Sequence, residues 1–199
     1  MFVLTMDQRG SRDVEDRVAD WLASLNDSFS AGLRLPFART AGDEMQAVVQ
    51  NPETLLEVVL RATRRDEWWV GVGLGTIERP LGETTRDSRG AAFVSARAAV
   101  EAAKRQPWGC AVRGDPDELA ASLEACLAML IFIRRTRTDR GWETADLAAT
   151  GLPGTEIARR LEISKQAVSQ RLRAAGFPEE RRGRTLAISL LNGSWKPAS

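Results

Sequence analysis

Residues 152–177, LPGTEIARRLEISKQAVSQRLRAAGF, constrain the fold of this 199-residue chain more than any other stretch. Ile157 and Ala158 lie on one apolar face of a first short helix, and Ala158 is small enough for a second helix to cross there. Ser164 is a favoured N-cap residue, so a second helix is expected to start at that point. Gly176 is placed to end it. The stretch therefore predicts two short helices joined by a turn.

The outward face of the second predicted helix contains no carboxylate. With the cap residue, that face consists of six polar or basic residues: Ser164, Lys165, Gln166, Ser169, Gln170 and Arg173. Gln side chains can read adenine through paired hydrogen bonds, whereas Arg and Lys can read guanine or hold phosphate. An exposed helix N-terminus also favours phosphate. These six residues are the predicted contacts to double-stranded DNA.

This stretch resembles the helix-turn-helix of bacterial transcription regulators, whose common form is EIAxxLGISxxxVSxxL. Glu162 stands where that form has Gly, at a position that is often left-handed, so we expect a strained or differently shaped turn. An ordinary amphipathic helix pair is the alternative interpretation of the same pattern.

Composition predicts a soluble globular protein. The hydrophobic fraction is 43% and the charged fraction 28%, as in globular proteins. No apolar run approaches the roughly 20 residues of a membrane span. No basic region precedes the short apolar N-terminal run, so we expect a cytoplasmic protein with no membrane partner. Histidine is absent, and Cys110 and Cys126 match no metal or redox spacing, which argues against a zinc site or a histidine-based catalytic triad.

Basic residues exceed acidic ones only in the second half of the chain. Arginines gather around the predicted helix pair, as expected of a protein that meets a phosphate backbone. They are Arg134, Arg135, Arg137, Arg140, Arg159, Arg160, Arg181, Arg182 and Arg184. Such clusters are usually only solvated faces, so this one supports the helix pattern without proving a DNA-binding role.

The first half predicts a ferredoxin-like α+β domain. Alternating or continuous apolar runs indicate strands, and apolar residues at helical spacing indicate helices. The predicted elements are a strand at 2–6, a helix from 13 to 29, a hairpin at 33–38 and 45–49, a helix at 52–63, a strand at 68–76 and a helix at 91–105. That order, βαββαβα, is typical of ferredoxin-like and palm folds.

Four short motifs give this half a resemblance to the SatD family and, beyond it, to the catalytic palm of class III nucleotidyl cyclases and GGDEF diguanylate cyclases. They are DQRGSR at 7–12, AGDEM at 41–45, VGVGLGT at 70–76 and RGAAFVSAR at 89–97. The resemblance covers about residues 1 to 106. It implies that Asp7 and Asp43 occupy the metal-binding positions of the cyclases, and that Arg97 occupies a phosphate-directed position.

The residues themselves favour a phosphate ligand at the same place. Asp7 ends the first predicted strand and Asp43 lies at the tip of the adjacent hairpin, where Mg²⁺ and nucleotide phosphates could bridge the two carboxylates. The remaining predicted ligand-binding residues are Gly10, Ser11 and Arg12, expected at a helix start, together with Gly42, Glu44 and Arg97. Alternatively, Asp7 caps a helix and the hairpin tip holds no ligand.

Departures from the cyclase pattern favour binding over turnover. Phe93 stands where many cyclases have an asparagine that supports the transition state, and no base-reading Lys and Asp pair is recognisable. Gly71, Gly73 and Gly75 alternate on one strand face and are expected to allow close packing there.

Three parts are predicted: a domain at 1–109, a long linker or dimerisation helix within 110–140, and an all-α DNA-binding domain at 141–199. The linker helix is expected from an N-cap at Asp115 to about residue 138. Met129 and Phe132 make its middle apolar all round, so it needs burial on more than one side. Packing between the domains or a subunit interface would supply that burial, and this helix is the expected contributor to a homodimer. Helices at 142–150 and 179–191 are expected to flank the helix pair.

The leading hypothesis is a transcription regulator whose cyclase-like domain binds a nucleotide or second messenger, such as a cyclic dinucleotide, and thereby modulates DNA binding. The first alternative is an active Mg²⁺-dependent nucleotidyl cyclase or transferase with a C-terminal localisation or assembly domain. The second alternative is a DNA-binding protein whose palm domain is only a dimerisation scaffold.

Overall fold

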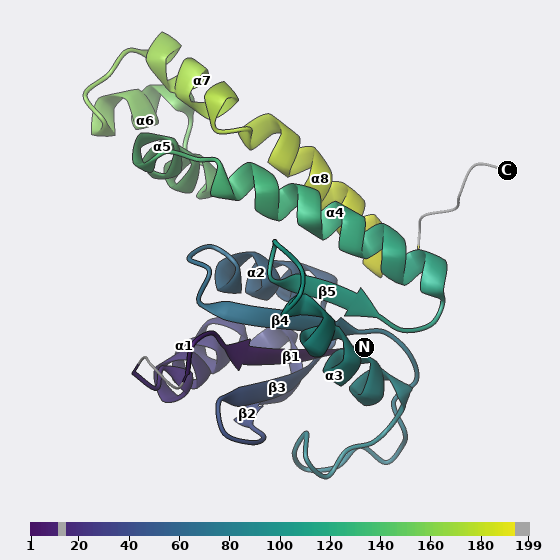
Figure 1. Ribbon diagram of the computed structural model, residues 1–199. Coiled ribbons are helices and arrows are strands. Elements are labelled where there is room, and N and C mark those ends of the chain that lie inside the picture. Colours follow the sequence, from purple (N-terminus) through teal and green to yellow (C-terminus); the bar gives the residue numbers. More distant parts are fainter. Residues whose placement is uncertain (12–14, 194–199) are drawn as a thin grey trace, which may run out of the picture.

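The computed structural model describes residues 1–11 and 15–193 and is a mixed α+β structure built on one five-stranded sheet (Figure 1). The strand order is β2-β3-β1-β4-β5, and only the β4–β5 pair is parallel. The strands are β1 (Phe2–Gln8), β2 (Leu33–Arg39), β3 (Glu44–Val49), β4 (Trp68–Gly73) and β5 (Cys110–Arg113). The predicted hairpin is therefore confirmed, whereas the strand predicted to reach residue 76 ends at Gly73.

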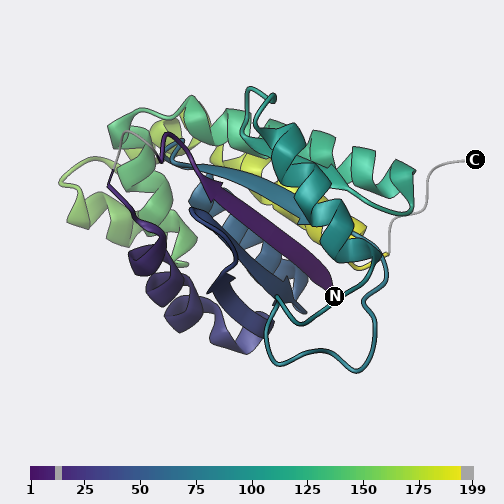
Figure 2. The ribbon, with the colours of Figure 1, turned by 60° about the horizontal axis from the view of Figure 1, so that its bottom comes forward.

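Helices cover both faces of this sheet (Figure 2). On one face lie α1 (Val18–Phe29) and α2 (Pro52–Ala62), and on the other lies α3 (Ala91–Ala103). Side chains of β1 alternate between them, since Leu4 and Met6 join the α1–α2 core while Val3 joins the α3 core. The predicted start of α2 is confirmed in detail, because the Asn51 side chain accepts a hydrogen bond from the Thr54 N–H at 2.8 Å.

The close approach of α3 to β4 depends on glycine. A Cβ atom on Gly71 would lie 2.3 Å from the Val100 backbone nitrogen and 2.5 Å from the Ala96 carbonyl oxygen. A Cβ atom on Gly73 would lie 2.1 Å from the Ala92 carbonyl oxygen. These contacts confirm the prediction of close packing on this strand face, and the occupant is α3 of the same chain.

The segment predicted as a linker begins as a strand. Cys110–Arg113 forms β5, which extends the sheet beside β4, and only then does α4 (Asp117–Arg135) begin. This helix is shorter at both ends than predicted, and its N-cap is Pro116 rather than Asp115. Four residues were too few for the sequence pattern to distinguish a buried strand from a loop.

The second half of the chain is helical and shares its core with the first. Helix α4 lies side by side with α8 (Phe177–Leu191), and α5 (Asp139–Ala149), α6 (Gly154–Arg160) and α7 (Lys165–Ala174) gather at one end of this pair (Figure 1). Leu127 and Leu190, from α4 and α8, belong to the same buried cluster as Leu4 and Leu55 from the sheet and α2. The two halves therefore do not have separate cores. Within the described residues, no helix is both long enough and apolar enough to cross a bilayer.

We expect Gly71→Ala to destabilise the fold by about 3 kcal/mol or more, because the added methyl group meets helix backbone that has no room to move. Gly154→Ala is the matched control, since a Cβ atom there meets nothing within 4 Å. Urea unfolding of both variants measures the difference. Equal stabilities would show that α3 does not approach β4 this closely.

Candidate DNA-contacting surface and ligand cavities

Helix α7 presents a polar face to solvent. Ser164 caps its start, accepting a hydrogen bond from the Ala167 N–H at 3.1 Å, as predicted. Val168 is buried against the neighbouring helices with 1% of its surface exposed. The predicted contact residues Ser164, Lys165, Gln166, Ser169, Gln170 and Arg173 are all exposed. The structure thus brings all six together on one accessible face.

The turn before α7 is left-handed at a non-glycine residue. Glu162 has φ of 53°, as anticipated from its place in the motif, and the next N–H, of Ile163, donates to the Ala158 carbonyl at 3.0 Å. Helix α6 contributes the buried Ile157 to the contact with α7. The turn has a shape that glycine would adopt with less strain.

Six of the nine arginines expected to meet a phosphate backbone are engaged in ion pairs within the chain. Arg134, Arg137 and Arg184 turn toward Glu180, and Arg135 pairs with Asp66. Arg159 and Arg160 both pair with Glu156. The expectation that all nine arginines form one external footprint is therefore wrong, because Arg134, Arg135, Arg137 and Arg184 turn toward carboxylates within the protein, whereas Arg159 and Arg160 stay exposed and pair locally with Glu156.

A smaller set of basic side chains stays available around α7. Five are exposed and make no ion pair with any other described residue: Arg140, Lys165, Arg173, Arg181 and Arg182. Arg171 instead reaches Glu143 of α5 at 3.6 Å, which ties α7 to the helix behind it. The surface near α7 is therefore basic even after the internal ion pairs are removed.

At the sheet edge predicted to bind phosphate, Asp7 already has a cationic partner. Lys104 Nζ, which follows α3, lies 3.1 Å from its carboxylate and 2.8 Å from that of Glu101. Burial raises the pKa of Asp7 above its ordinary value; Lys104 opposes this shift, and the nearby Asp43 and Glu101 add to it. The Asp7 carboxylate therefore binds a cation, and in this structure that cation is the Lys104 ammonium group.

The other predicted residues of this region divide between two cavities. Ser11, Gly42 and Asp43 line a small cavity of about 260 Å³ together with Gln8 and Asp16. Gly10 lies in the adjoining turn, and Arg12 lies outside the described residues. Helix α1 begins only at Val18, so the prediction that Gly10 and Ser11 lie at a helix start is wrong.

Arg97 lines a larger cavity of about 650 Å³ between α3, the β2–β3 hairpin and the segment before α3. Phe93 and Val94 give this cavity an apolar wall, and Arg86 gives it a second guanidinium. Glu44 lies at its edge and pairs with Arg97 at 3.1 Å. The structure brings Glu44 and Arg97 together, but it does not place them in one cavity with Asp43.

The two carboxylates predicted to bind a metal, Asp7 and Asp43, have no third protein carboxylate or thiol beside them in an arrangement that could hold an ion, among the described residues. One or two carboxylates, with waters and phosphate oxygens, are enough to hold Mg²⁺, but here the Lys104 ammonium group competes for Asp7. We therefore derive no metal-dependent step from this region.

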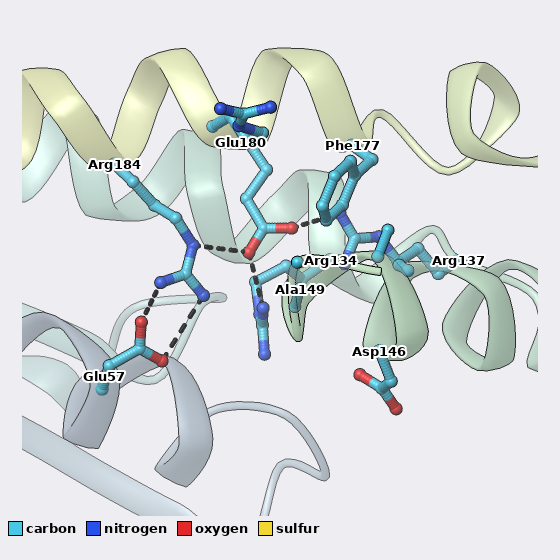
Figure 3. Close-up of a pocket in the computed structure, with 12 residues that line it drawn as sticks. Glu57, Arg134, Arg137, Asp146, Ala149, Phe177, Glu180 and Arg184 are labelled. Atoms are coloured by element: carbon cyan, nitrogen blue, oxygen red, sulfur yellow. Dashed lines mark hydrogen bonds and ion pairs between the residues drawn. The ribbon is translucent and has the colours of Figure 1, made fainter. Parts of the chain in front are cut away.

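A third group of residues lies where the two halves meet, and nothing in the sequence pattern singled it out. Glu180 of α8 is 3% exposed and accepts hydrogen bonds from three arginines (Figure 3). Arg134 reaches it at 2.6 Å and Arg184 at 2.9 Å, and Arg137 is the third donor. Burial alone would raise the pKa of Glu180, but the arginines outweigh burial and lower that pKa to about 2.

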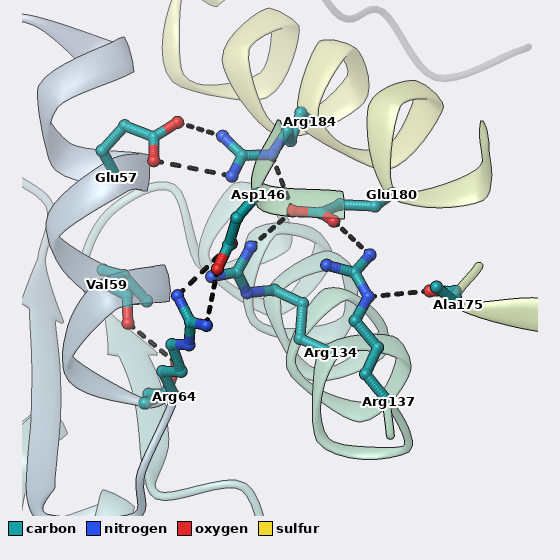
Figure 4. Close-up of polar contacts among 10 residues, drawn as sticks. Glu57, Val59, Arg64, Arg134, Arg137, Asp146, Ala175, Glu180 and Arg184 are labelled. Atoms are coloured by element: carbon teal, nitrogen blue, oxygen red, sulfur yellow. Dashed lines mark hydrogen bonds and ion pairs between the residues drawn. The ribbon is translucent and has the colours of Figure 1, made fainter. Parts of the chain in front are cut away.

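This cluster is linked to both halves of the protein (Figure 4). Arg184 also pairs with Glu57 of α2, on the face of the sheet that α1 and α2 cover. Arg137 Nε donates to the carbonyl oxygen of Ala175, the C-cap residue of α7, at 2.8 Å. A separate pair joins Arg64, just after α2, to Asp146 of α5 at 2.8 Å. The cluster thus connects the sheet layer to the end of the exposed α7 helix.

No protein-family model matches this chain, and comparisons with curated proteins and with solved structures likewise found no match. The functional conclusions below therefore rest on the geometry of this molecule.

We expect acid to destabilise the protein through Glu180. Its pKa is lowered from 4.5 to about 2 on folding, so its stabilising effect is complete above pH 4.5 and is lost as the pH falls from there toward 2. Glu180→Gln should lower the free energy of unfolding at neutral pH by about 3–5 kcal/mol, because the buried arginines lose their counter-charge. Its stability should also depend less on pH in that window.

Glu179→Gln is the matched control, because Glu179 is the exposed neighbour on the same helix. Denaturant unfolding of wild type and both variants across this pH range provides the measurement. A Glu180→Gln protein as stable as the Glu179→Gln protein at neutral pH would contradict the buried network.

Proposed function

We propose that the protein is a DNA-binding transcription regulator in which α6 and α7 form a helix-turn-helix and α7 is the recognition helix. The single observation that carries this proposal is the face of α7, where six exposed polar or basic residues occur without any carboxylate. The capped N-terminus of α7 adds a partial positive charge suited to a phosphate group. Exposed basic residues on both sides of α7 would position it on the duplex.

The internal contacts of the helical unit support this proposal. A recognition helix must be held rigidly, since readout of base edges requires hydrogen-bond geometry. Val168 anchors α7 on its inner face, Arg171 ties it to α5, and Arg137 binds its C-terminal end. These anchors all lie on the side of α7 that faces the protein, so the polar side stays available for the groove.

The proposed function extends to the first half of the chain. Its succession of elements and its strand order support the proposal of a ferredoxin-like, cyclase-palm-like domain, with β5 added at one edge of the sheet. The cavity at Arg97, with an apolar wall and two guanidinium groups, has the size and chemistry for a nucleotide or a similar second messenger. In this proposal a nucleotide bound there acts as an effector that modulates DNA binding.

We expect alanine at Gln166 or Gln170 to cost about 1–3 kcal/mol of affinity for a preferred site, because each can make paired hydrogen bonds to a base. Affinity for random DNA should change little. Arg173→Ala should weaken both if it holds a phosphate, and it should reduce the salt dependence of binding. The measurement is fluorescence anisotropy with a site selected from a random pool and with random duplexes, at fixed salt.

Arg34→Ala is the control, since Arg34 is an exposed arginine on β2, in the first half of the chain. Losses of equal size on selected and random DNA for all three α7 variants would exclude α7 as the recognition helix.

The proposed regulator acts as a homodimer, because one helix-turn-helix makes few base contacts and pairs usually read half-sites about 34 Å apart. Helix α4 provides an exposed apolar surface for the second copy. Leu127, Leu130 and Ile131 are buried within the chain, but Met129 and Phe132 remain 58% and 51% exposed. Phe132 rests edge-on against Trp108 at 5.4 Å between ring centroids, which widens the apolar surface.

We expect sedimentation to give a dimeric mass for wild type at micromolar concentration and a monomeric mass for the double variant Met129→Glu, Phe132→Glu, because charges at this surface oppose its burial. Val94→Glu serves as the control, since Val94 is an exposed apolar residue on α3. A wild-type protein that is monomeric with and without DNA would contradict the dimer.

A further inference from the structure

The cavity beside Glu180 has no role in the DNA-binding surface or in the Arg97 region. It measures about 560 Å³, within the range of small-molecule sites. Its walls come from α2, α4, α5 and α8 (Figure 3). Ala145, Ala148 and Ala149 of α5 leave it open on one side, and Phe177 offers an aromatic surface.

The charges around this cavity do not balance. Four arginines line it, Arg134, Arg137, Arg181 and Arg184, against three carboxylates, Glu57, Asp146 and Glu180. Asp146 is further engaged by a fifth arginine, Arg64. Arg134 and Arg137 are 11% and 1% exposed and share the one carboxylate of Glu180. Burying a guanidinium without its own counter-charge is costly, so the site favours an added anion.

Unused hydrogen-bond donors lie on the same walls. Arg134 Nε is buried and has no partner among the described residues, and Arg181 is exposed and makes no ion pair with them. The first turn of α8 has no side-chain cap, and its N–H groups at Phe177 and Glu179 have no intrahelical partner. Pro178 has no N–H, and the Glu180 N–H donates to the Gly176 carbonyl at 2.9 Å. Planar guanidinium groups and free helix N–H groups together are the chemistry that binds phosphate.

The aromatic residues nearby are consistent with surplus positive charge. Trp142 lies beneath three guanidinium groups, those of Arg64, Arg134 and Arg137, at 3.8, 4.7 and 4.9 Å from its ring centroid. Cation–π contacts of this kind stabilise guanidinium groups that outnumber their carboxylates, and here three arginines share Asp146 and Glu180. The Trp142 ring thus stabilises part of the excess positive charge of the arginines, and the rest of that charge faces the cavity.

We infer that this cavity is a binding site for a phosphate-bearing small molecule of about nucleotide size. Its phosphate contacts Arg181, Arg134 and the start of α8, and its organic part packs between Phe177 and the alanines of α5. The site lies apart from the Arg97 cavity and from α7. Because its walls come from both halves, an occupant stabilises their present arrangement, which includes the Arg137 contact to the end of α7.

The test is calorimetry and thermal melting of the full-length protein without DNA. Inorganic pyrophosphate and the mono-, di- and triphosphates of adenosine and guanosine are the probes. We expect at least one to bind and to raise Tm. Arg181→Ala should weaken that binding about tenfold, because it removes a charged hydrogen-bond donor. Ala149→Trp should abolish it by filling the open side of the cavity.

Two controls separate this site from its neighbours. Arg182→Ala removes the adjacent exposed arginine of α8, which does not line the cavity, and should leave probe binding unchanged. Arg97→Ala should also leave it unchanged, whereas a probe bound in the Arg97 cavity would bind more weakly. Circular dichroism of each variant confirms that the fold is intact.

The inference is wrong if no probe binds at millimolar concentration, or if binding survives both Arg181→Ala and Ala149→Trp. A result in which no probe binds but Arg181→Ala weakens DNA binding would identify the anion as the DNA backbone and would also overturn it. None of these outcomes depends on whether α7 reads base sequence, so failure here and failure of the proposed DNA binding are distinguishable.

Discussion

One buried carboxylate, Glu180, determines how the two halves of this molecule are joined. Three arginines from different parts of the chain converge on it, and one of them continues to Glu57 on the helix beneath the sheet. A charged group that is only 3% exposed is tolerated only when its partners are held in place. The alignment of α4 with α8, and the position of α5, α6 and α7 at the end of that pair, follow from this requirement and from the shared apolar core.

The ion pairs of this cluster reduce the number of arginines that are free to contribute to a basic surface. A count of arginines in the second half predicts a broad basic surface, but six of the nine are paired internally or locally. The basic residues left around α7 are fewer and more specific in their placement. Electrostatic attraction to DNA in the proposed regulator therefore depends on a handful of side chains, while the remaining arginines position α7 and line a cavity of their own.

In the region of Asp7 and Arg97 the predicted elements follow one another as expected, but the side chains are not arranged as predicted. Asp7, Asp43 and Arg97 come from the expected elements or turns, since the strand order brings β1 next to the hairpin. Lys104, however, neutralises Asp7, and α1 starts too late for Gly10 and Ser11 to lie at its N-terminus. Residue type and spacing predicted one site, but the structure divides its residues between two cavities. The charge of Asp7 is paired with Lys104, which follows α3 and is far from Asp7 in sequence.

The local sequence pattern was sufficient to predict most helices and strands of this protein. It also predicted the cap at Asn51, the start of α7 at Ser164 and the left-handed turn at Glu162. Each of these features depends on residues within one or two turns of chain. The spacing of Gly71 and Gly73 likewise predicted a close neighbour. Only the tertiary structure decided that β5 joins the sheet, that α4 and α8 complete its core, and that Glu180 gathers Arg134, Arg137 and Arg184. These features depend on contacts between segments far apart in sequence, and neither periodicity nor composition specifies which distant charges and apolar faces meet.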